Sequence, residues 1–209
     1  MEVKSFPNGI YGAITYLVYD KKSLEGALID CTCSIDEIEE IVKKEKINLK
    51  YILLTHGHFD HVYCLKEAKE KFPTVQILIH KEDEILLKQI KMQCSMADIE
   101  DIEVPCLDGL LDDNSHNLTL GVNEIKIIPT KGHSKGGICY LINDILFSGD
   151  TLFQGSIGRC DLWGGSFSEI EKSIKEKLFT LDENTIVYPG HGDKTSIKYE
   201  KKFNPYFGG

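Results

Sequence analysis

Thr55-His56-Gly57-His58-Phe59-Asp60-His61 follows directly on the apolar run Tyr51-Ile52-Leu53-Leu54. A short apolar run before a glycine-containing polar stretch is typical of a buried strand that leads into a loop. Side chains alternate along an extended segment, so His56 and His58 point to the same side, whereas the neighbours Asp60 and His61 must diverge. Imidazole nitrogens and carboxylate oxygens are ligands that zinc, iron and manganese accept. The stretch therefore predicts two neighbouring metal positions better than one.

Three other apolar runs end in the same way. Each leads through a glycine-containing loop to a side chain that can bind metal: Ile125–Ile128 to His133, Ile145–Phe147 to Asp150, and Ile186–Tyr188 to His191. One histidine at a strand end is most simply structural. Four strand ends that carry His and Asp predict a site, because sheet topology gathers such loops at one edge.

Length and charge limit the class of protein. With 209 residues the chain is expected to fold as a single domain over residues 1–209. The formal net charge of −9 argues against nucleic acid or an anionic membrane as a partner and leaves a small-molecule substrate. No apolar run approaches the ~18 residues that span a bilayer. The sequence does not define an oligomeric state.

Cysteine usage indicates a reducing compartment. The chain contains seven cysteines, no C-x-x-C pair and no signal-peptide pattern after Met1, so we expect a cytoplasmic protein without disulfides. Cys31 and Cys33 are interpreted as small buried residues at a strand end, with a soft-metal pair as the alternative.

The order of predicted elements indicates an α/β (α+β) chain. Antiparallel strands are expected at Ile10–Tyr19 and Gly26–Asp30, and capping boxes are expected to begin helices at Ser34, with Glu37, and at Ser166, with Glu169. Further strands are predicted at Leu49–Leu54, Val75–Ile79, Leu118–Leu120, Asn123–Ile128, Gly137–Ile142, Ile145–Phe147 and Thr185–Tyr188, and further helices at Val62–Phe72 and Lys81–Lys91. The acidic segment Met92–Asn117 is predicted to be irregular, either a lid or a surface excursion.

The spaced motifs resemble a known family. His56-x-His58-x-Asp60-His61, Gly132-His133, Ser148-Gly149-Asp150 and Gly190-His191 have the order found in metallo-β-lactamase-fold hydrolases, specifically their short, single-domain glyoxalase II-like branch. The resemblance covers most of the chain and implies a four-layer αββα sandwich of two mixed β-sheets with outer helices.

The resemblance also implies how the ligands divide. His56, His58 and His133 would hold one divalent ion, Asp60, His61 and His191 a second, and Asp150 would bridge them, so that Asp60 and Asp150 are the carboxylates assigned to catalysis. Zinc is the first choice for both ions, with iron or manganese as alternatives. Two such ions share a water, lower its pKa and provide a bridging hydroxide that attacks a carbonyl.

The expected reaction is thioester hydrolysis of the S-lactoylglutathione (hydroxyacylglutathione) type. A mononuclear Fe(II) persulfide dioxygenase using His56, His133 and Asp150, a hydrolase of another small ester or lactone, and a non-catalytic metal-storing protein are the alternatives. Lactamases of this fold lack the bridging aspartate, which disfavours β-lactam hydrolysis. Glyoxalase II enzymes of two domains bind glutathione through basic residues of a C-terminal region that this chain does not show. Arg159 either clamps a substrate carboxylate or pairs with Asp161 to fix its loop.

Overall fold

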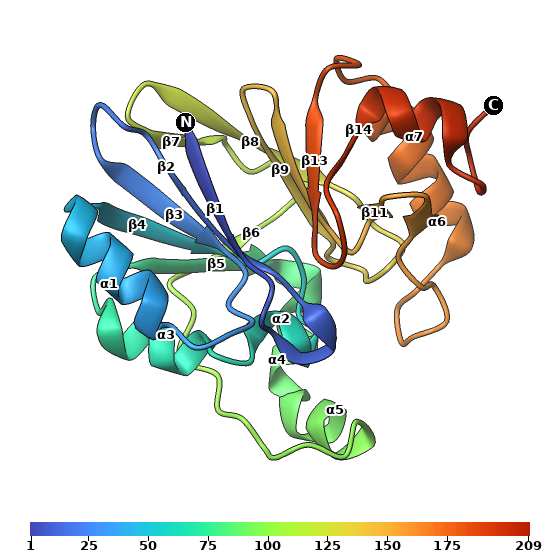
Figure 1. Ribbon diagram of the computed structural model, residues 1–209. Helices are drawn as coiled ribbons and strands as arrows, with labels where there is room; N and C mark the ends of the chain where they lie inside the picture. Colours follow the sequence, from blue (N-terminus) through green and yellow to red (C-terminus); the bar gives the residue numbers. More distant parts are fainter.

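Two six-stranded sheets pack face to face in the computed structural model, which describes residues 1–209, and helices cover both outer faces (Figure 1). The N-terminal sheet has the order β1 (Glu2–Phe6), β2 (Thr15–Tyr19), β3 (Glu25–Ile29), β4 (Asn48–Leu53), β5 (Gln76–His80) and β6 (Gly109–Leu111). The C-terminal sheet has the order β14 (Thr195–Ser196), β13 (Ile186–Pro189), β10 (Ile145–Gly149), β9 (Ile138–Ile142), β8 (Asn123–Pro129) and β7 (Leu118–Leu120). The predicted αββα sandwich of mixed sheets is confirmed.

The helices are short and lie on both outer faces. Those packed on the N-terminal sheet are α1 (Asp36–Glu45), α3 (Leu65–Lys71), α4 (Glu84–Lys88) and α5 (Ile90–Met96), and those on the C-terminal sheet are α6 (Phe167–Ser173), a π-helical turn (Ile174–Leu178) and α7 (Ile197–Phe203). Two 3-10 turns (Ile10–Gly12 and Lys81–Asp83), helix α2 (Phe59–Val62) and the small hairpin of β11 (Leu152–Phe153) and β12 (Ser156–Ile157) complete the chain. No helix combines the length and the apolar character needed to cross a membrane.

Alternating side chains divide each strand between two cores. In β2, Tyr16 and Val18 face the opposite sheet, whereas Leu17 and Tyr19 face the outer helices. In β10, Phe147 points between the sheets and Leu146 points toward α6. This two-residue period is what buried strands of a layered fold require, because each sheet is covered on both faces.

Parallel strands direct the site loops to one edge of the sandwich. Strands β3, β4, β5 and β6 are parallel to one another in the N-terminal sheet, and β10 is parallel to β13 in the C-terminal sheet. The carboxyl ends of β3 and β4 and those of β10 and β13 therefore deliver their loops to the same region, as parallel topology favours.

The predicted capping box at Ser166 forms in part, and the one at Ser34 does not form. The Ser166 side chain accepts a hydrogen bond from the Glu169 amide at the start of α6, but the Ser166 amide donates to the Gly132 carbonyl at 2.8 Å and not to Glu169. Helix α1 begins at Asp36, and the Ser34 hydroxyl accepts from the Asp36 amide at 3.4 Å and not from the Glu37 amide. The Ile35 amide donates to the Glu67 carboxylate of α3 at 3.1 Å, so a tertiary contact satisfies one donor at this helix end.

Two predicted helices are broken. The expected helix Val62–Phe72 is divided into α2 and α3 where the Cys64 amide donates to the Cys31 carbonyl at 2.9 Å, and α2 begins early enough to include Asp60 and His61. The expected helix Lys81–Lys91 becomes a 3-10 turn, α4 and α5, and Leu87, not the predicted Ile85, faces the core. The region 92–117 contributes the end of α5 and strand β6, so it is less irregular than predicted.

Candidate metal centre

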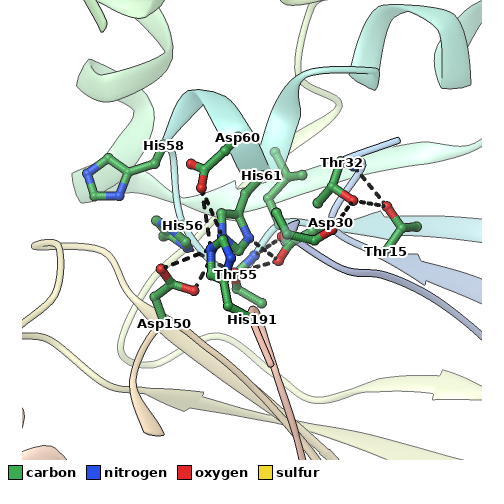
Figure 2. A network of polar contacts seen from close by, with 12 residues as sticks. Thr15, Asp30, Thr32, Thr55, His56, His58, Asp60, His61, Asp150 and His191 are labelled. Atoms are coloured by element: carbon green, nitrogen blue, oxygen red, sulfur yellow. Dashed lines mark hydrogen bonds and ion pairs between the residues drawn. The ribbon is translucent and has the colours of Figure 1, made fainter. Parts of the chain in front are cut away.

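The predicted ligands meet at the loop edge described above (Figure 2). His56 and His58 follow β4, Asp60 and His61 lie on α2, and Asp150 and His191 follow β10 and β13. His133 comes from the loop after β8. The seven side chains form three overlapping groups whose ligand atoms lie within 4.8 Å of one another, namely His56/His58/His133, His56/His61/Asp150 and Asp60/His61/His191.

Distances within the groups are those of ligands that share an ion. His58 Nδ1 lies 2.9 Å from His133 Nε2, and His61 Nε2 lies 3.2 Å from His191 Nε2. Asp60 Oδ2 is 3.3 Å from His191 Nε2. Two nitrogens bound tetrahedrally to one zinc lie about 3.4 Å apart. The His/Asp clusters are therefore consistent with a dinuclear metal site.

Asp150 lies between the two outer groups. Its Oδ1 is 3.3 Å from His61 Nε2, and its Oδ2 is 3.6 Å from both His133 Nε2 and His191 Nε2. One carboxylate thus reaches histidines of both groups, which is the position that a bridging ligand requires. Metal binding by these residues stays a prediction.

Hydrogen bonds select one tautomer for four of the histidines. His133 Nδ1 faces the Arg159 carbonyl at 2.8 Å and His191 Nδ1 faces the Tyr11 carbonyl at 3.2 Å, and carbonyls only accept. His61 Nδ1 donates in the same way to the Asp30 carboxylate at 2.8 Å. In its neutral form each of these rings therefore carries its proton on Nδ1 and presents a bare Nε2 to the site.

The fourth tautomer is selected through a relay. The Thr55 hydroxyl donates to Asp30 Oδ2 at 2.8 Å, so its oxygen is left to accept from His56 Nδ1 at 3.0 Å. Asp30 also accepts from the Thr55 amide at 2.8 Å. In Figure 2, Asp30 and Asp150 lie on opposite sides of the histidines.

Two buried polar atoms make no hydrogen bond of good geometry, His56 Nε2 and Asp150 Oδ1, although Asp150 Oδ1 lies 3.3 Å from His61 Nε2. An unpaired buried polar atom costs about 1–3 kcal/mol. Both atoms are good metal ligands and both lie inside the cluster, so the residues present fit a bound divalent ion. This is the strongest single indication that the cluster binds metal.

The surroundings shift the pKa values in opposite directions. Burial lowers the pKa of His56 and lowers that of His58 to about 3. Burial alone would raise the pKa of Asp150, but the neighbouring His61 and other histidines bring it well below its usual range. Burial opposes protonation of His61 and His191, yet the carboxylates around them raise both pKa values above the ordinary range.

These directions predict that the two metals bind with different proton counts. His56 and His58 are neutral at pH 7 and release no proton when an ion binds between them. His61 and His191 have raised pKa values, so an ion in their group must displace protons, and its affinity rises with pH through the neutral range. Calorimetric titration with Zn²⁺ in buffers of different ionisation enthalpy measures this, and equal proton release in both binding phases would contradict the prediction.

Gly190, immediately before His191, leaves room for Asp150. A Cβ at position 190 would lie 2.2 Å from Asp150 Oδ1 and 2.7 Å from His61 Cε1. Gly190→Ala is therefore expected to lower metal affinity about 10- to 100-fold, the range seen when ligand orientation is disturbed. Metal content after dialysis checks this. Asp193→Ala is the control, because Asp193 is an exposed residue of the same loop, two residues after His191; equal metal loss in both variants would show that the close approach is unimportant.

Two buried aspartates of the site were not assigned roles from the sequence. Asp30 orients His61 and Thr55, and it follows the apolar strand β3, so it had the same strand-end signal as the ligands. Asp83 accepts from the Gly57 amide, the Ser134 hydroxyl and the Gly136 amide at 3.1, 2.7 and 2.6 Å. Asp83 thus joins the His56–His58 loop to the His133 loop. It lies in an acidic helical segment where no sequence signal distinguishes it.

The remaining candidates have mixed outcomes. Arg159 forms a bidentate pair with Asp161 at 2.8 and 2.7 Å and also lines the cavity over the site. Trp163 is 53% exposed and lines the same cavity. The His80 side chain accepts from the Glu82 amide and so has a structural role, and His116 is exposed.

An αββα sandwich with His/Asp groups at one edge defines a class of metal-dependent hydrolases. Within that class, the family model described as the metallo-β-lactamase superfamily matches residues 12–191, and the chain belongs to this superfamily.

The names of two relatives support the hydrolase class. The chain is 36% identical to the probable metallo-hydrolase YqgX of Bacillus subtilis over 83% of this chain and 82% of that one. It is 29% identical to the hydroxyacylglutathione hydrolase GloC of Haemophilus influenzae, over 99% of this chain and 98% of that one. Among solved structures, the B3 metallo-β-lactamase BLEG-1 superposes with a TM-score of 0.90, at 32% identity and full coverage of both chains.

Proposed function

We propose that the protein hydrolyses acyl thioesters of the S-lactoylglutathione type at a dinuclear metal centre. The observation that carries the proposal is the pair of unpartnered buried ligand atoms, His56 Nε2 and Asp150 Oδ1, inside a cluster of seven His and Asp side chains. The similarity to the Haemophilus influenzae enzyme supports the choice of thioester.

The geometry supports the following division of the ligands. His56, His58 and His133 would hold one ion, Asp60, His61 and His191 the other, with Asp150 between them. When bound, two divalent ions supply a hydroxide near neutral pH and polarise a carbonyl. Zinc is our first choice, and iron and manganese suit the same ligands.

The chain itself supplies orientation. Asp30 and Thr55 fix the planes and tautomers of His61 and His56, and the Arg159 and Tyr11 carbonyls do the same for His133 and His191. No side chain is required as a general acid toward the leaving group, because a thiol has a pKa of only about 8.5 and leaves as thiolate. A thioester is therefore the acyl substrate that this set of side chains suits best.

A thioester panel tests the proposal. Protein reconstituted with Zn²⁺, Fe²⁺ or Mn²⁺ is assayed by thiol release from S-lactoylglutathione and from uncharged acyl thioesters, with chelated protein as the blank. We expect hydrolysis that depends on added metal. Absence of thiol release with every metal, or oxygen consumption with glutathione persulfide in its place, would overturn the proposal.

β-Lactam hydrolysis is the second candidate, because the similarity to BLEG-1 extends over the whole chain. Asp150 disfavours it, since the family resemblance implies that lactamases of this fold lack a bridging aspartate at that position. A chromogenic cephalosporin in the same metal-reconstituted panel separates the two functions. Faster turnover of the cephalosporin than of every thioester would replace the first proposal by the second.

A further inference from the structure

A cavity of about 580 Å³ opens over the candidate metal centre. Its floor includes His58, Asp60 and Asp150, and the facing wall is formed by α5 and by the loop after β12. In Figure 1, α5 projects from the body of the molecule beyond α4. A volume of this size holds a ligand much larger than a lactoyl group.

The facing wall is apolar although it is exposed. Met92, Met96, Trp163 and Tyr11 are 52%, 80%, 53% and 69% exposed, and all four line the cavity. The chain has three methionines and one tryptophan, so both internal methionines and the only tryptophan are at this cavity and not in a core. Tyr11 is further held edge-on against Phe59, another lining residue, with ring centroids 5.8 Å apart.

The charge at the cavity does not favour a thioester whose thiol part bears several negative charges. No lysine lines it, and its one arginine, Arg159, is already paired with Asp161 through two hydrogen bonds. Lys135 stacks over the Trp163 ring at 5.1 Å from its centroid. Apart from the amide groups of Gln89 and Gln93, the cavity therefore offers mainly apolar surface for recognition of a substrate beyond its carbonyl, and flexible methionine side chains adapt to a flexible ligand.

We propose that this cavity binds an aliphatic chain on the thioester. The preferred substrates are then thioesters that carry such a chain, which Met92 and Met96 of α5 and Trp163 contact. This inference rests on the proposed thioester hydrolysis for its reaction, but the aliphatic recognition is a separate property of the cavity.

A chain-length series measures this property. Butyryl, hexanoyl and octanoyl thioesters of N-acetylcysteamine share one uncharged thiol, and the acetyl thioester of octanethiol carries the chain on the other side. A buried methylene is worth about fourfold, so kcat/KM is expected to rise roughly two- to fourfold per methylene, or about 15- to 250-fold from butyryl to octanoyl. A gain in either series supports the proposal and tells which side of the carbonyl the chain occupies, whereas flat series on both sides overturn it.

Variants test whether the effect of chain length on kcat/KM depends on α5. The double variant Met92→Gln/Met96→Gln is expected to reduce the butyryl-to-octanoyl gain to about threefold or less, because the wall loses its apolar surface. Ser95→Gln is the matched control, since Ser95 is exposed on the same helix but does not line the cavity. An unchanged gain in the double variant, or an equal loss in Ser95→Gln, would overturn the role of the methionines.

Trp163 provides a readout that needs no catalysis. The S-octyl thioether of N-acetylcysteamine has no carbonyl and cannot be cleaved, and its binding should shift the emission of the single tryptophan to shorter wavelength by covering an exposed ring. Saturable shift without cleavage of any thioester would leave aliphatic recognition in place and refute the proposed reaction. Thioester cleavage with no shift and no chain-length effect would refute aliphatic recognition alone.

Discussion

Asp150→Asn is expected to lower kcat/KM for thioester hydrolysis by about 10³-fold or more, which corresponds to a loss of roughly 4 kcal/mol of transition-state stabilisation. Asparagine keeps the shape of the side chain but removes the negative charge that faces His61, His133 and His191. Without that charge, no carboxylate between the two ligand groups offsets the positive charge of two divalent ions. We therefore expect loss of bound metal together with loss of activity.

Metal content and thiol release are measured on the same preparation. Asp144→Asn is the control, because Asp144 is an exposed aspartate only six residues away, in the turn between β9 and β10. It should retain both properties. Near-normal activity of Asp150→Asn would remove the bridging role, and Asp150→Ala would then show whether position 150 matters at all.

Much of the site could be predicted because most of the ligands come directly after a strand, although Asp60 and His61 lie on α2. The apolar runs before His56, Asp150 and His191 form β4, β10 and β13, and parallel pairing brings their carboxyl ends to one edge. An alternation of side chains with a period of two and a glycine after it are local properties of the sequence. The strands and the loops that follow them can therefore be predicted without knowing which other strands they pair with.

Helix ends depended on partners that are remote in sequence. The Ser34–Glu37 capping box does not form at the start of α1, and the Ile35 amide donates to Glu67, 32 residues further along the chain. The break before α3 follows from the contact between Cys64 and Cys31, and the role of Asp83 appears only when the Gly57 and Ser134 loops are adjacent. Hydrogen bonds of this kind are set by topology, and propensity is only a weak prior against them.

Asp30→Asn is expected to empty both metal positions while leaving the fold largely intact. The amide oxygen can replace Oδ1 as acceptor for the Thr55 amide, but the amide nitrogen then stands where Oδ2 accepted from the Thr55 hydroxyl and from His61 Nδ1. A donor at that place forces His61 to accept through Nδ1 and to carry its proton on Nε2, toward the site. A protonated nitrogen cannot bind a metal ion.

The same change passes through Thr55 to His56. Once its hydroxyl no longer donates to position 30, it donates to His56 Nδ1, so this ring also moves its proton to Nε2. Because His56 and His61 are proposed to hold different ions, this one substitution should lower the affinity for both ions, each by at least the 10- to 100-fold typical of lost orienting partners.

Comparison with Asp30→Ala separates the effect on the histidine tautomers from the effect on the stability of the fold. Alanine leaves the Thr55 amide, the Thr55 hydroxyl and His61 Nδ1 without their buried acceptor, which is expected to cost about 3–5 kcal/mol of unfolding free energy. Urea unfolding in chelator measures that cost without a contribution from bound metal. We expect Asp30→Ala to be markedly destabilised there and Asp30→Asn to lose less.

Asp20→Asn is the matched control, because Asp20 is also a buried aspartate after a strand of the N-terminal sheet, but it follows β2, which runs antiparallel to β3 and so ends at the opposite edge. It accepts from the Ser23 amide and contacts no predicted ligand. Its metal content should equal that of the unmodified protein. Full metal content in Asp30→Asn would mean that ring orientation, and not the position of the proton, is what Asp30 provides.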